Sequence, residues 1–484
     1  MGVTTVNWQG RFAILGWGVS GKASAHALVK RGAQLCAFDG RAREDDQSEN
    51  DANVEFVSEA DSDALAQAVI DWKPDCIVVS PGIPAHHPIF PAAINAGVEL
   101  IGEVELAWRL QEDSEHAGRP WLCVTGTNGK TTTVGMLGAM LRAAGENAVE
   151  VGNIGLPICE AIDTDATVFA VELSSFQLHT VSTVSPLASV CLNVDADHLD
   201  WHGSAQAYAA DKAKVYHLTQ KACFYPASDI TVENMVAEAD VVEGARAIGL
   251  TLGIPSISQV GWVEDALVER AFVEKRHMQA QFLAEVDDLR VAYHDGVTDA
   301  ARMDATAAAG LARAFGVPPE AVAEGLRSFT PAHHRRAVIS HAADVTWIDD
   351  SKATNAHAAV ASLSGITPGT AVWIAGGDTK GQEFGDLVTR VAPVLRGVVV
   401  IGKDRSAIVN ALRQRTPQVP FVEVDGHEDW MFSVVNEAVA LSRPGDTVVL
   451  APACASWDQF RSYAQRGDVF RDAVKRLEAN WAAQ

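Results

Sequence analysis

A short glycine turn between a strand-like run and a helix-like run constrains the fold of this chain most strongly. Residues 121–125 are apolar and strand-like, a helix-like run follows to about residue 144, and the turn between them reads Gly126-Thr127-Asn128-Gly129-Lys130-Thr131-Thr132. Glycines let backbone N–H groups approach phosphate oxygens, while a helix start, a lysine and a hydroxyl can complete a magnesium–triphosphate site. Val124 stands where the full Walker pattern has its first glycine, so the turn is shorter than that pattern. We expect a nucleotide site; the alternative is an ordinary turn with a solvated lysine.

A second glycine turn lies near the N-terminus and reads Gly16-Trp17-Gly18-Val19-Ser20-Gly21. It follows an apolar run at 11–16 and precedes a helix-like run at 23–30, and Asp39 ends the next strand-like run. An acidic residue at that place binds a ribose hydroxyl in NAD enzymes. The turn Ser80-Pro81-Gly82 closes another strand of the same block and could add backbone donors. These residues leave open a nicotinamide cofactor, another nucleotide and a structural turn.

The length of 484 residues predicts two to four domains. Strand-like and helix-like runs alternate in three blocks, which favours α/β domains with parallel sheets. A polar stretch at 111–119 and the sequence Phe329-Thr330-Pro331 separate the blocks. The third block has strand-like runs at 345–349, 371–375, 397–401 and 447–450. We therefore predict domains at residues 1–115, 116–330 and 331–484.

Composition excludes several classes of protein. Lys and Arg number 38 against 62 Asp and Glu, a net charge of −24, so the chain repels polyanions and no nucleic-acid partner is expected. No apolar run approaches the ~18–20 residues of a membrane span, and no signal pattern opens the chain, so we expect no membrane insertion and a cytoplasmic location. The seven cysteines are odd in number and widely spaced, which indicates reduced core residues without a metal cluster.

Hard metal ligands follow the strands of the second block. Glu172 ends the strand-like run at 167–172, and Asp197-His198-Leu199-Asp200 follows a run that ends at Asn193. The carboxyl ends of parallel strands face one crevice, so Glu172, Ser174, Asn193 and His198 could converge near the glycine turn. Carboxylate and hydroxyl oxygens suit Mg²⁺. Taken singly, each residue is equally well an ordinary polar strand end or a hydrogen-bonded histidine.

Other charged residues have weaker patterns. Lys212 and Lys214 lie in a stretch at 208–216 with helical periodicity, and their spacing alone indicates a solvated face. In the third block, Lys352, Lys380 and Arg335 lie at strand ends or at the domain boundary. An acidic protein that binds an anion needs cations at such places. The alternative is that these are turns with surface charges.

Several motifs together resemble one family. The glycine turn at 126–132 and three further motifs of the second block resemble the central ATPase domain of the Mur ligases, ATP-dependent amide-forming enzymes of peptidoglycan precursor synthesis. The further motifs are Gly152-Asn153-Ile154-Gly155, Glu172-Leu173-Ser174-Ser175-Phe176-Gln177 and Asp197-His198-Leu199-Asp200. Three strings of the third block resemble the branch of that family that adds D-glutamate: Asp350-Ser351-Lys352-Ala353-Thr354-Asn355, Ala453-Cys454-Ala455-Ser456 and Gln465-Arg466-Gly467. The resemblance runs from about residue 11 to residue 472.

The resemblance implies a fold and a reaction. The fold is α/β, with a Rossmann-like N-terminal domain, a central P-loop-type ATPase domain and a Rossmann-like C-terminal domain. The reaction joins D-glutamate to UDP-N-acetylmuramoyl-L-alanine through an acyl phosphate and converts ATP to ADP and phosphate. ATP and two Mg²⁺ ions are then needed, the partners are the small-molecule substrates alone, and the chain is a monomer. The N-terminal turn binds a UDP diphosphate, which replaces the nicotinamide interpretation.

The resemblance also implies site residues. The catalytic residues are Lys130, His198 and Lys212. The ATP-binding residues are Gly126, Thr127, Asn128, Gly129, Lys130, Thr131, Thr132, Arg335 and Asp350. The UDP-substrate residues are Gly18, Val19, Ser20, Asp39, Arg41, Ser80, Pro81, Gly82, Asn153, Ser174, Gln177 and His198, with Asp39 and Arg41 near the uracil. The D-glutamate residues are Lys352, Thr354, Lys380, Ser456, Trp457 and Tyr463. The metal ligands are Thr131, Glu172, His198 and a carbamylated Lys212.

The chain departs from the family pattern in two places. The family's adenine-binding His-Asn-x-x-Asn motif is replaced by Ala300-Ala301-Arg302-Met303-Asp304, which leaves the adenine contacts undefined, and Tyr463 stands where phenylalanine is more common. Two competing functions remain for comparison. An NAD-dependent dehydrogenase leaves Lys130, Glu172 and Lys352 unexplained. A non-catalytic nucleotide-binding regulator is supported only by the missing adenine motif.

Overall fold

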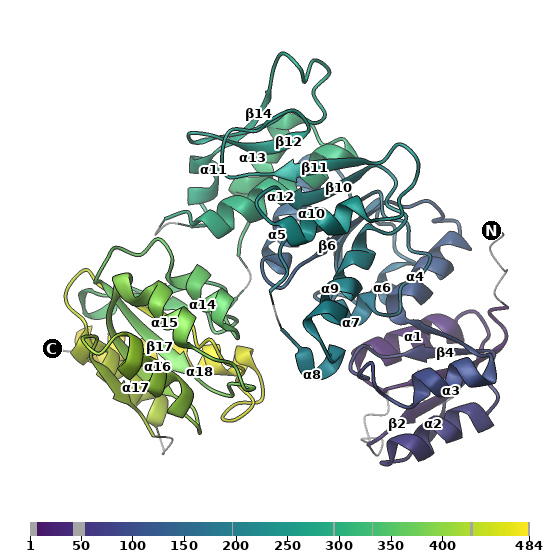
Figure 1. The fold of residues 1–484 in the computed structure, drawn as a ribbon, viewed down its shortest axis with the longest axis horizontal. Coiled ribbons are helices and arrows are strands. Elements are labelled where there is room, and N and C mark those ends of the chain that lie inside the picture. Colours follow the sequence, from purple (N-terminus) through teal and green to yellow (C-terminus); the bar gives the residue numbers. More distant parts are fainter. Residues whose placement is uncertain are drawn as a thin grey trace. The chain divides into compact units, whose positions relative to one another are not determined.

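The protein contains three β-sheets, which the computed structural model shows for residues 7–41, 54–195, 197–293, 296–331, 333–425 and 429–482 (Figure 1). The chain groups into two compact units. One unit holds the chain up to Ala292 together with Ala301–Phe329, and the other holds Tyr293–Ala300 and the chain from Thr330. The domain boundaries near residues 115 and 330 stay predictions.

The N-terminal sheet has five parallel strands in the order β3-β2-β1-β4-β5. Its strands are β1 (Arg11–Leu15), β2 (Gln34–Asp39), β3 (Glu55–Ser58), β4 (Cys76–Val79) and β5 (Glu99–Gly102). Its helices are α1 (Val19–Val29), α2 (Ser62–Asp71) and α3 (Ile89–Ala96), and α4 (Glu103–Glu112) follows β5. β4 and the part of β1 after Arg11 are apolar and buried, because helices cover both faces of a parallel sheet. The glycine turn after β1 therefore lies at the carboxyl edge of this sheet.

The second sheet has nine strands in the order β14-β13-β12-β11-β10-β9-β6-β8-β7. They are β6 (Trp121–Thr125), β7 (Ala148–Gly152), β8 (Val168–Glu172), β9 (Ala188–Cys191), β10 (Ala222–Pro226), β11 (Arg246–Leu250), β12 (Gln259–Val263), β13 (Ala266–Glu269) and β14 (Gln281–Glu285). β6 lies between β8 and β9, so the phosphate-type turn and the ends of two neighbouring strands meet at one edge. The last three strands pair antiparallel, an extension that the sequence patterns did not indicate.

Helices connect the strands of the second sheet. They are α5 (Lys130–Ala143), α6 (Ile158–Ala161), α7 (Ser175–Leu178), α8 (Leu199–His202), α9 (Ala205–Ala213), α10 (Ile230–Ala237), α11 (Val286–Arg290), α12 (Asp299–Phe315) and α13 (Pro319–Ser328). α13 begins at a proline, as predicted from Pro318-Pro319, because proline lacks the N–H that the first turn leaves unpaired. Helix α5 starts at Lys130, directly after Gly129, and directs its N-terminus at the preceding glycines of the turn.

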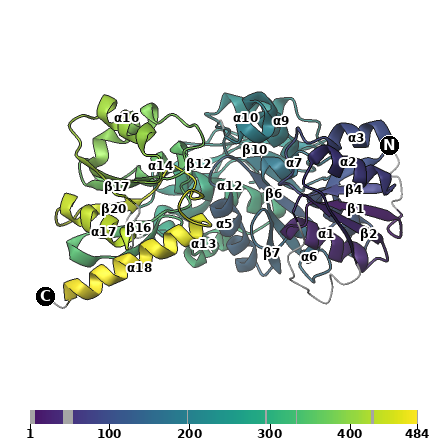
Figure 2. The ribbon, with the colours of Figure 1, turned by 90° about the horizontal axis from the view of Figure 1, so that it is seen from below.

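The C-terminal sheet has six strands in the order β15-β16-β20-β17-β18-β19, and only β15 is antiparallel to its neighbour. They are β15 (Ala337–Ser340), β16 (Thr346–Asp349), β17 (Ala371–Gly376), β18 (Leu395–Ile401), β19 (Phe421–Glu423) and β20 (Thr447–Leu450). α14 (Ala356–Leu363), α15 (Gly385–Val391) and α16 (Ser406–Arg415) pack on one face. α17 (Trp430–Leu441) and the long α18 (Tyr463–Ala482) pack on the other (Figure 2).

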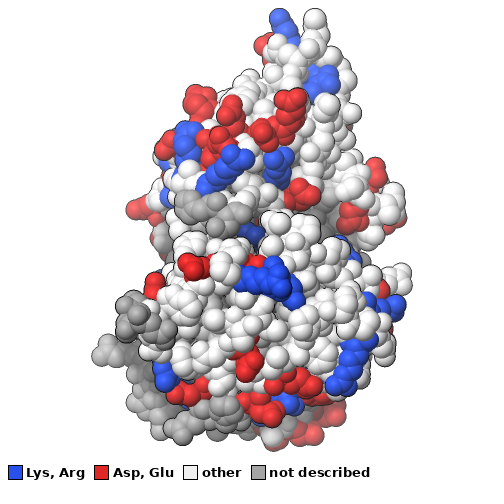
Figure 3. Space-filling model, turned by 90° about the vertical axis from the view of Figure 1, so that its left-hand side faces the viewer, with Lys and Arg blue, Asp and Glu red and all other residues white. Residues whose placement is uncertain are grey.

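Three whole-chain expectations can be compared with this fold. The predicted α/β class with parallel sheets is confirmed. All seven cysteines are free and buried, as expected of reduced core residues. None of the helices in the described part of the chain combines the length and the apolar composition of a membrane span. Lys and Arg are interspersed with Asp and Glu on the face in Figure 3.

Candidate active site

The glycine turn after β6 forms a phosphate-type loop. Gly126 and Gly129 have φ of +149° and +87°, which side-chain-bearing residues rarely adopt. Lys130 Nζ donates to the carbonyls of Gly126 and Thr127 at 2.8 and 2.9 Å. The backbone N–H of Asn128 donates to Asn193 Oδ1 at 2.8 Å, so the strand end at β9 supports the loop as predicted. The arrangement presents backbone N–H groups and an ammonium at a helix N-terminus, which suits a polyphosphate.

Lys212 lies under the same loop. Its side chain is 1% exposed, Nζ donates to the carbonyl of Gly126 at 2.8 Å, and it lies 4.7 Å from the centre of the Tyr208 ring. Burial, reinforced by nearby Lys130, lowers the pKa of Lys212 to about 7. The solvated face that spacing indicated is therefore wrong for Lys212, because α9 packs this side chain against the loop.

Tyr208 contacts Lys212, whereas Lys214 pairs with another residue of α9. The Tyr208 hydroxyl lies 2.9 Å from Thr127 Oγ1, so one side chain contacts both the lysine and the loop. No motif indicated this role for Tyr208, because only the packing of α9 creates it. Lys214 is paired with Asp211 at 3.0 Å and is partly exposed.

Glu172 ends β8 and is buried against the start of α5. Its Oε2 accepts a hydrogen bond from Thr131 Oγ1 at 2.7 Å, and its Oε1 accepts one from Asn153 Nδ2 at 2.8 Å. A carboxylate beside a threonine hydroxyl offers two of the oxygen ligands that Mg²⁺ prefers. No group of three or more His, Cys, Asp or Glu in the described ranges could hold a metal ion. The Thr131 and Glu172 oxygens fit a Mg²⁺ ion that takes its remaining ligands from phosphate and water.

His198 belongs to an aromatic cluster. It has a φ of +53°, and its ring centre lies 4.8 Å from that of Phe176, which stacks on His202 at 5.5 Å. Asp211 Oδ2 lies 3.0 Å from His202 Nδ1 and 2.8 Å from His179 Nδ1. Asp211 belongs to α9, the helix that carries Lys212, so the cluster connects the His198 loop to that helix.

A cavity of about 490 Å³ opens at the carboxyl edge of the N-terminal sheet. All the N-terminal residues predicted to bind the UDP substrate line it: Gly18, Val19, Ser20, Asp39, Arg41, Ser80, Pro81 and Gly82. Asp39 accepts hydrogen bonds from the backbone N–H groups of Trp17 at 2.7 Å and Arg41 at 2.9 Å. Leu65 and Ile83 also line the cavity and were not predicted. Ile83 belongs to the Pro81–Pro84 turn, whereas Leu65 lies on α2 in no recognisable motif.

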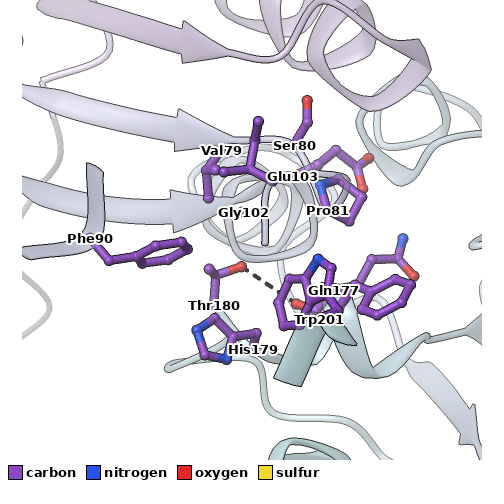
Figure 4. A pocket seen from close by; sticks show the side chains of 12 residues that line it. Val79, Ser80, Pro81, Phe90, Gly102, Glu103, Gln177, His179, Thr180 and Trp201 are labelled. Atoms are coloured by element: carbon purple, nitrogen blue, oxygen red, sulfur yellow. Dashed lines mark hydrogen bonds between the residues drawn. The ribbon is translucent and has the colours of Figure 1, made fainter. Parts of the chain in front are cut away.

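A second, much smaller cavity lies close by and has room for about one water molecule, at about 10 Å³ (Figure 4). Gln177, His179, Thr180 and Trp201 line it from the middle of the chain, and Phe90 and Glu103 line it from the N-terminal side. Gln177 and Ser174 form a capping box that begins α7. The predicted substrate residues Ser174 and Gln177 are thus held rigidly in one turn.

The predicted D-glutamate residues lie on loops at the carboxyl edge of the C-terminal sheet. Lys352 and Thr354 follow β16, Lys380 follows β17, Ser456 and Trp457 follow β20, and Tyr463 begins α18. Lys352 Nζ lies 4.0 Å from the centre of the Tyr463 ring.

The loops after β17 and β20 are also joined by backbone. Asp378 and Ala455 exchange two backbone hydrogen bonds of 2.9 Å. Ser456 is buried, whereas Trp457 is 68% exposed. These loops therefore bring together two lysines, a hydroxyl and an aromatic ring within the C-terminal unit.

Two predicted ATP-binding residues also belong to the C-terminal unit. Asp350 follows β16, and burial raises its pKa to about 6, with nearby Arg335 acting in the opposite direction. His334 Nδ1 lies 2.6 Å from Asp349 Oδ2. The contact of Asp350 and Arg335 with ATP stays a prediction.

Asp304, at the site of the missing adenine motif, lies against the phosphate-type loop. Its Oδ1 accepts a hydrogen bond from Thr133 Oγ1 at 3.3 Å, and a Cβ on Gly129 would come within 2.4 Å of it. The substituted motif is thus next to the loop, although the adenine contacts stay undefined.

Comparisons with known proteins agree with this geometry. Three family models match: the Mur ligase MurD-like N-terminal domain at residues 10–102, the Mur ligase middle domain at 124–249 and the Mur ligase glutamate ligase domain at 334–454. A UDP-N-acetylmuramoylalanine–D-glutamate ligase of Streptomyces coelicolor is 47% identical over 96% of this chain and 98% of its own length. The enzyme of that name from Leifsonia xyli is 43% identical over 97% of this chain and 93% of its own length.

Solved structures share the fold at low identity. The MurF ligase of Thermotoga maritima in complex with ADP superposes with a TM-score of 0.57 at 15% identity, covering 97% of this chain and 95% of that one. A pseudomurein peptide ligase type C from Methanothermus fervidus gives 0.56 at 16% identity, covering 97% and 100%. The sequence relatives, each far above 30% identical and matched over nearly the whole chain, decide the family. The protein belongs to the Mur ligase family.

Proposed function

We propose that this protein joins D-glutamate to UDP-N-acetylmuramoyl-L-alanine and converts ATP to ADP and phosphate. The observation that carries the proposal is the phosphate-type loop, where Lys130 and Lys212 both donate to the Gly126 carbonyl and Thr131 meets buried Glu172. The relatives that are 43–47% identical over nearly the whole chain carry this activity in their names. The reaction belongs to peptidoglycan precursor synthesis.

The UDP part of the substrate fits the N-terminal cavity. Its volume of about 490 Å³ lies within the usual range of ligand pockets. The backbone N–H groups at the start of α1 face this cavity through Gly18, Val19 and Ser20, and suit a diphosphate. Asp39 and Arg41, which line the same cavity, would lie near the uracil. Asn153, Ser174, Gln177 and His198 would hold the muramoyl-alanine end.

The chemistry follows from the charges of the reactants. The substrate carboxylate attacks the γ-phosphate of ATP, ADP leaves, and an acyl phosphate forms. The amine of D-glutamate then attacks the acyl carbon, and phosphate leaves through a tetrahedral intermediate. Stabilising negative charge and positioning the reactants supply most of the catalysis in phosphoryl transfer. Lys130 and the loop N–H groups would hold the phosphates, with Arg335 and Asp350 as further ATP contacts. The catalytic side chains would be Lys130, Lys212 and His198.

Thr131 and Glu172 would hold one Mg²⁺ ion, and His198 with a modified Lys212 would serve a second. When bound, Mg²⁺ neutralises the charge that develops on the transferred phosphate. Glu172 is already oriented by Thr131 and Asn153, so the carboxylate pays little ordering entropy on binding a cation.

Carbamylation of Lys212 is supported by its surroundings. The neutral amine attacks CO₂, an N–C bond forms, and a proton is released to leave a carbamate, which converts a cation into an oxygen ligand. Only the neutral amine reacts, and burial lowers the pKa of Lys212 to about 7, so a large fraction is neutral at physiological pH. An ordinary lysine, with a pKa near 10.5, would be almost entirely protonated.

D-Glutamate carries two carboxylates, which fit the cationic loops of the C-terminal sheet. Lys352 and Lys380 would pair with carboxylates, Thr354 and Ser456 would donate hydroxyl hydrogen bonds, and Trp457 and Tyr463 would pack on the carbon chain. One chain supplies every group named, so we propose a monomer. A reaction that consumes ATP also places the enzyme in the cytoplasm.

The test is a coupled assay of ADP release. We expect ADP only when ATP, UDP-N-acetylmuramoyl-L-alanine and D-glutamate are all present, with L-glutamate as the matched control. ADP release that does not depend on D-glutamate would contradict the assigned amino acid. Nucleotide binding without any release of ADP would favour the non-catalytic regulator, and NAD-dependent absorbance changes would favour the dehydrogenase.

A further inference from the structure

Arg466 lies in the middle of the loops assigned to D-glutamate, yet it has no role in the proposed reaction. It belongs to α18, three residues after Tyr463, and its side chain is 1% exposed. The loops around it follow β16 and β20 and are not themselves strands or long helices. The ladder between β16 and β20 ends at Asp349 and Leu450, and beyond it the Ala453 N–H donates to the Ala353 carbonyl at 2.9 Å. The rest of the spacing between the two loops depends on side-chain hydrogen bonds.

The guanidinium of Arg466 makes five hydrogen bonds to these loops. Nε donates to Ser351 Oγ at 3.0 Å, and Nη2 donates to the Ser351 carbonyl at 2.8 Å. Nη1 and Nη2 donate to the Cys454 carbonyl at 3.2 and 3.1 Å, and Nη1 donates to the Ala455 carbonyl at 3.3 Å. Every acceptor is a neutral oxygen, and the acceptors come from the loops after both β16 and β20.

Ser351 extends this network to the start of α18. Its hydroxyl accepts from Arg466 Nε and donates to the Tyr463 carbonyl at 2.7 Å. The residues beside these anchor points are the ones assigned to D-glutamate. Lys352 follows Ser351 directly, Ser456 follows Ala455 directly, and the Tyr463 ring contacts Lys352. A movement of Arg466 would therefore change the distance between two halves of the amino-acid site.

Burying the Arg466 guanidinium costs free energy, and this cost is offset only when the acceptors match the geometry of its N–H donors. A buried charge is expensive unless hydrogen bonds compensate it, and burial lowers the pKa of Arg466 to about 10. Only arginine offers five N–H donors in a rigid planar fork, whereas lysine offers a single compact ammonium. The fork can reach acceptors on both loops at once.

We propose that Arg466 is a positioning residue for D-glutamate, whose planar fork sets the spacing between the Lys352 loop and the Ser456 loop. This inference rests on the proposed function, because that function assigns these loops to the amino acid. Arg466 does not touch the substrate; it acts through Ser351, Cys454 and Ala455.

The test separates fork geometry from charge. In Arg466→Lys the positive charge remains, but one ammonium cannot hold both loops, so the KM for D-glutamate should rise about tenfold or more while the KM for ATP changes less than about twofold. Misplacing a reacting group by ~1 Å costs up to ~100-fold in such sites. Arg466→Met keeps the length and removes every donor, and it should raise the D-glutamate KM further.

The matched control is Arg396→Met. Arg396 pairs with buried Asp446 at the opposite, amino edge of the same sheet, with Nη2 donating to Oδ1 at 3.0 Å. It should lower the thermal midpoint without changing the D-glutamate KM. If Arg466→Lys and Arg396→Met reduce activity alike, with no specific change in that KM, Arg466 is merely structural and the proposal is wrong.

Hydrogen–deuterium exchange provides a readout that does not depend on catalysis. In Arg466→Lys, amides at 351–355 and 454–460 should exchange at least about fivefold faster, while those of β18 stay unchanged. Unchanged exchange at both loops would overturn the proposal. Wild-type protein that releases no ADP with D-glutamate would instead refute the proposed function, and the exchange measurement would still test whether Arg466 holds the loops.

Discussion

Lys212 and Arg466 are both cations that are almost completely buried, one in each compact unit, and they differ in how that charge is compensated. Lys212 makes one hydrogen bond to the Gly126 carbonyl and lies above the Tyr208 ring, and its pKa is lowered to about 7. Arg466 makes five hydrogen bonds, and its pKa remains near 10. Burial therefore leaves the lysine able to lose its proton, whereas the arginine stays charged.

The difference shows how the same desolvation cost can serve reactivity in one place and rigidity in another. A lysine with few partners relieves the cost by becoming neutral, and a neutral amine is a nucleophile. An arginine cannot relieve it in this way and must be saturated with acceptors, which fixes the backbone that supplies them. We expect Lys212 to be carbamylated and Arg466 to hold the two loops at a fixed spacing.

The strongest test of this contrast is to replace Lys212 with residues that cannot present a neutral amine. Lys212→Ala should lower turnover by about 10²–10³-fold, the usual cost of losing one group that stabilises charge in a transition state. Lys212→Arg should not restore it, because arginine keeps the charge but cannot form a carbamate. The measurement is the rate of ADP release, with substrate binding by calorimetry as the control. Full activity of the alanine variant would contradict the proposed role.

Glu103 extends the comparison to a buried carboxyl group. Its Oε1 accepts from the Cys159 N–H at 2.7 Å, and Oε2 is buried without a partner among the described residues. Burial raises its pKa from 4.5 to about 7, so between these values the unfolded chain loses the proton while the folded protein keeps it, and stability falls as pH rises.

The corresponding measurement is urea unfolding of wild type and Glu103→Gln. Glutamine does not ionise, so the free energy of unfolding of the variant should not fall with that of wild type as the pH rises. Between pH 4.5 and pH 8 the variant should become more stable than wild type by up to about 3 kcal/mol. At pH 4.5 most of this difference in unfolding free energy between the variant and wild type should be absent. A constant difference across this range would show that Glu103 is not protonated in the folded protein.

The smallest effect concerns CO₂. Enzyme prepared in CO₂-depleted buffer should lose activity and recover it when bicarbonate is added, because carbamylation is reversible. At equal dissolved CO₂, the initial rate of recovery at pH 6 should be roughly fivefold lower than at pH 7, since the neutral fraction of an amine with a pKa of about 7 falls by that factor. Rates of ADP release at both pH values are the measurement, and Lys212→Ala is the control that should not respond. Equal recovery at pH 6 and pH 7 would contradict a neutral Lys212.

The strands and the loops that follow them were largely predictable. The runs at 121–125 and 447–450 match β6 and β20 to the residue, because each is a short apolar stretch bounded by turn residues. The antiparallel β12–β14 extension was not predicted, because short strands with mixed polarity give no distinct period. Glycine turns and strand-end carboxylates are local features, so the lining of the N-terminal cavity and the Thr131–Glu172 contact followed from their positions.

Residues that act through packing were harder to recognise. Leu65 enters the N-terminal cavity only because α2 packs against β2 and α3, and Tyr208 contacts Thr127 only because α9 lies against the glycine loop. For Lys212, spacing indicated a solvated side chain, and the family resemblance alone indicated its importance. Nothing in the local sequence around Arg466 indicated its hydrogen bonds, since its acceptors lie more than ten residues away.

The sequence by itself determined the α/β class, the glycine loops and the residues that end each strand, because these depend on periodicity and on neighbours a few positions apart. Only the tertiary structure decided which charges are buried and how many acceptors surround each one. Desolvation depends on every element that packs around a group, and that environment sets whether a buried cation such as Lys212 can give up its proton or, like Arg466, must keep it.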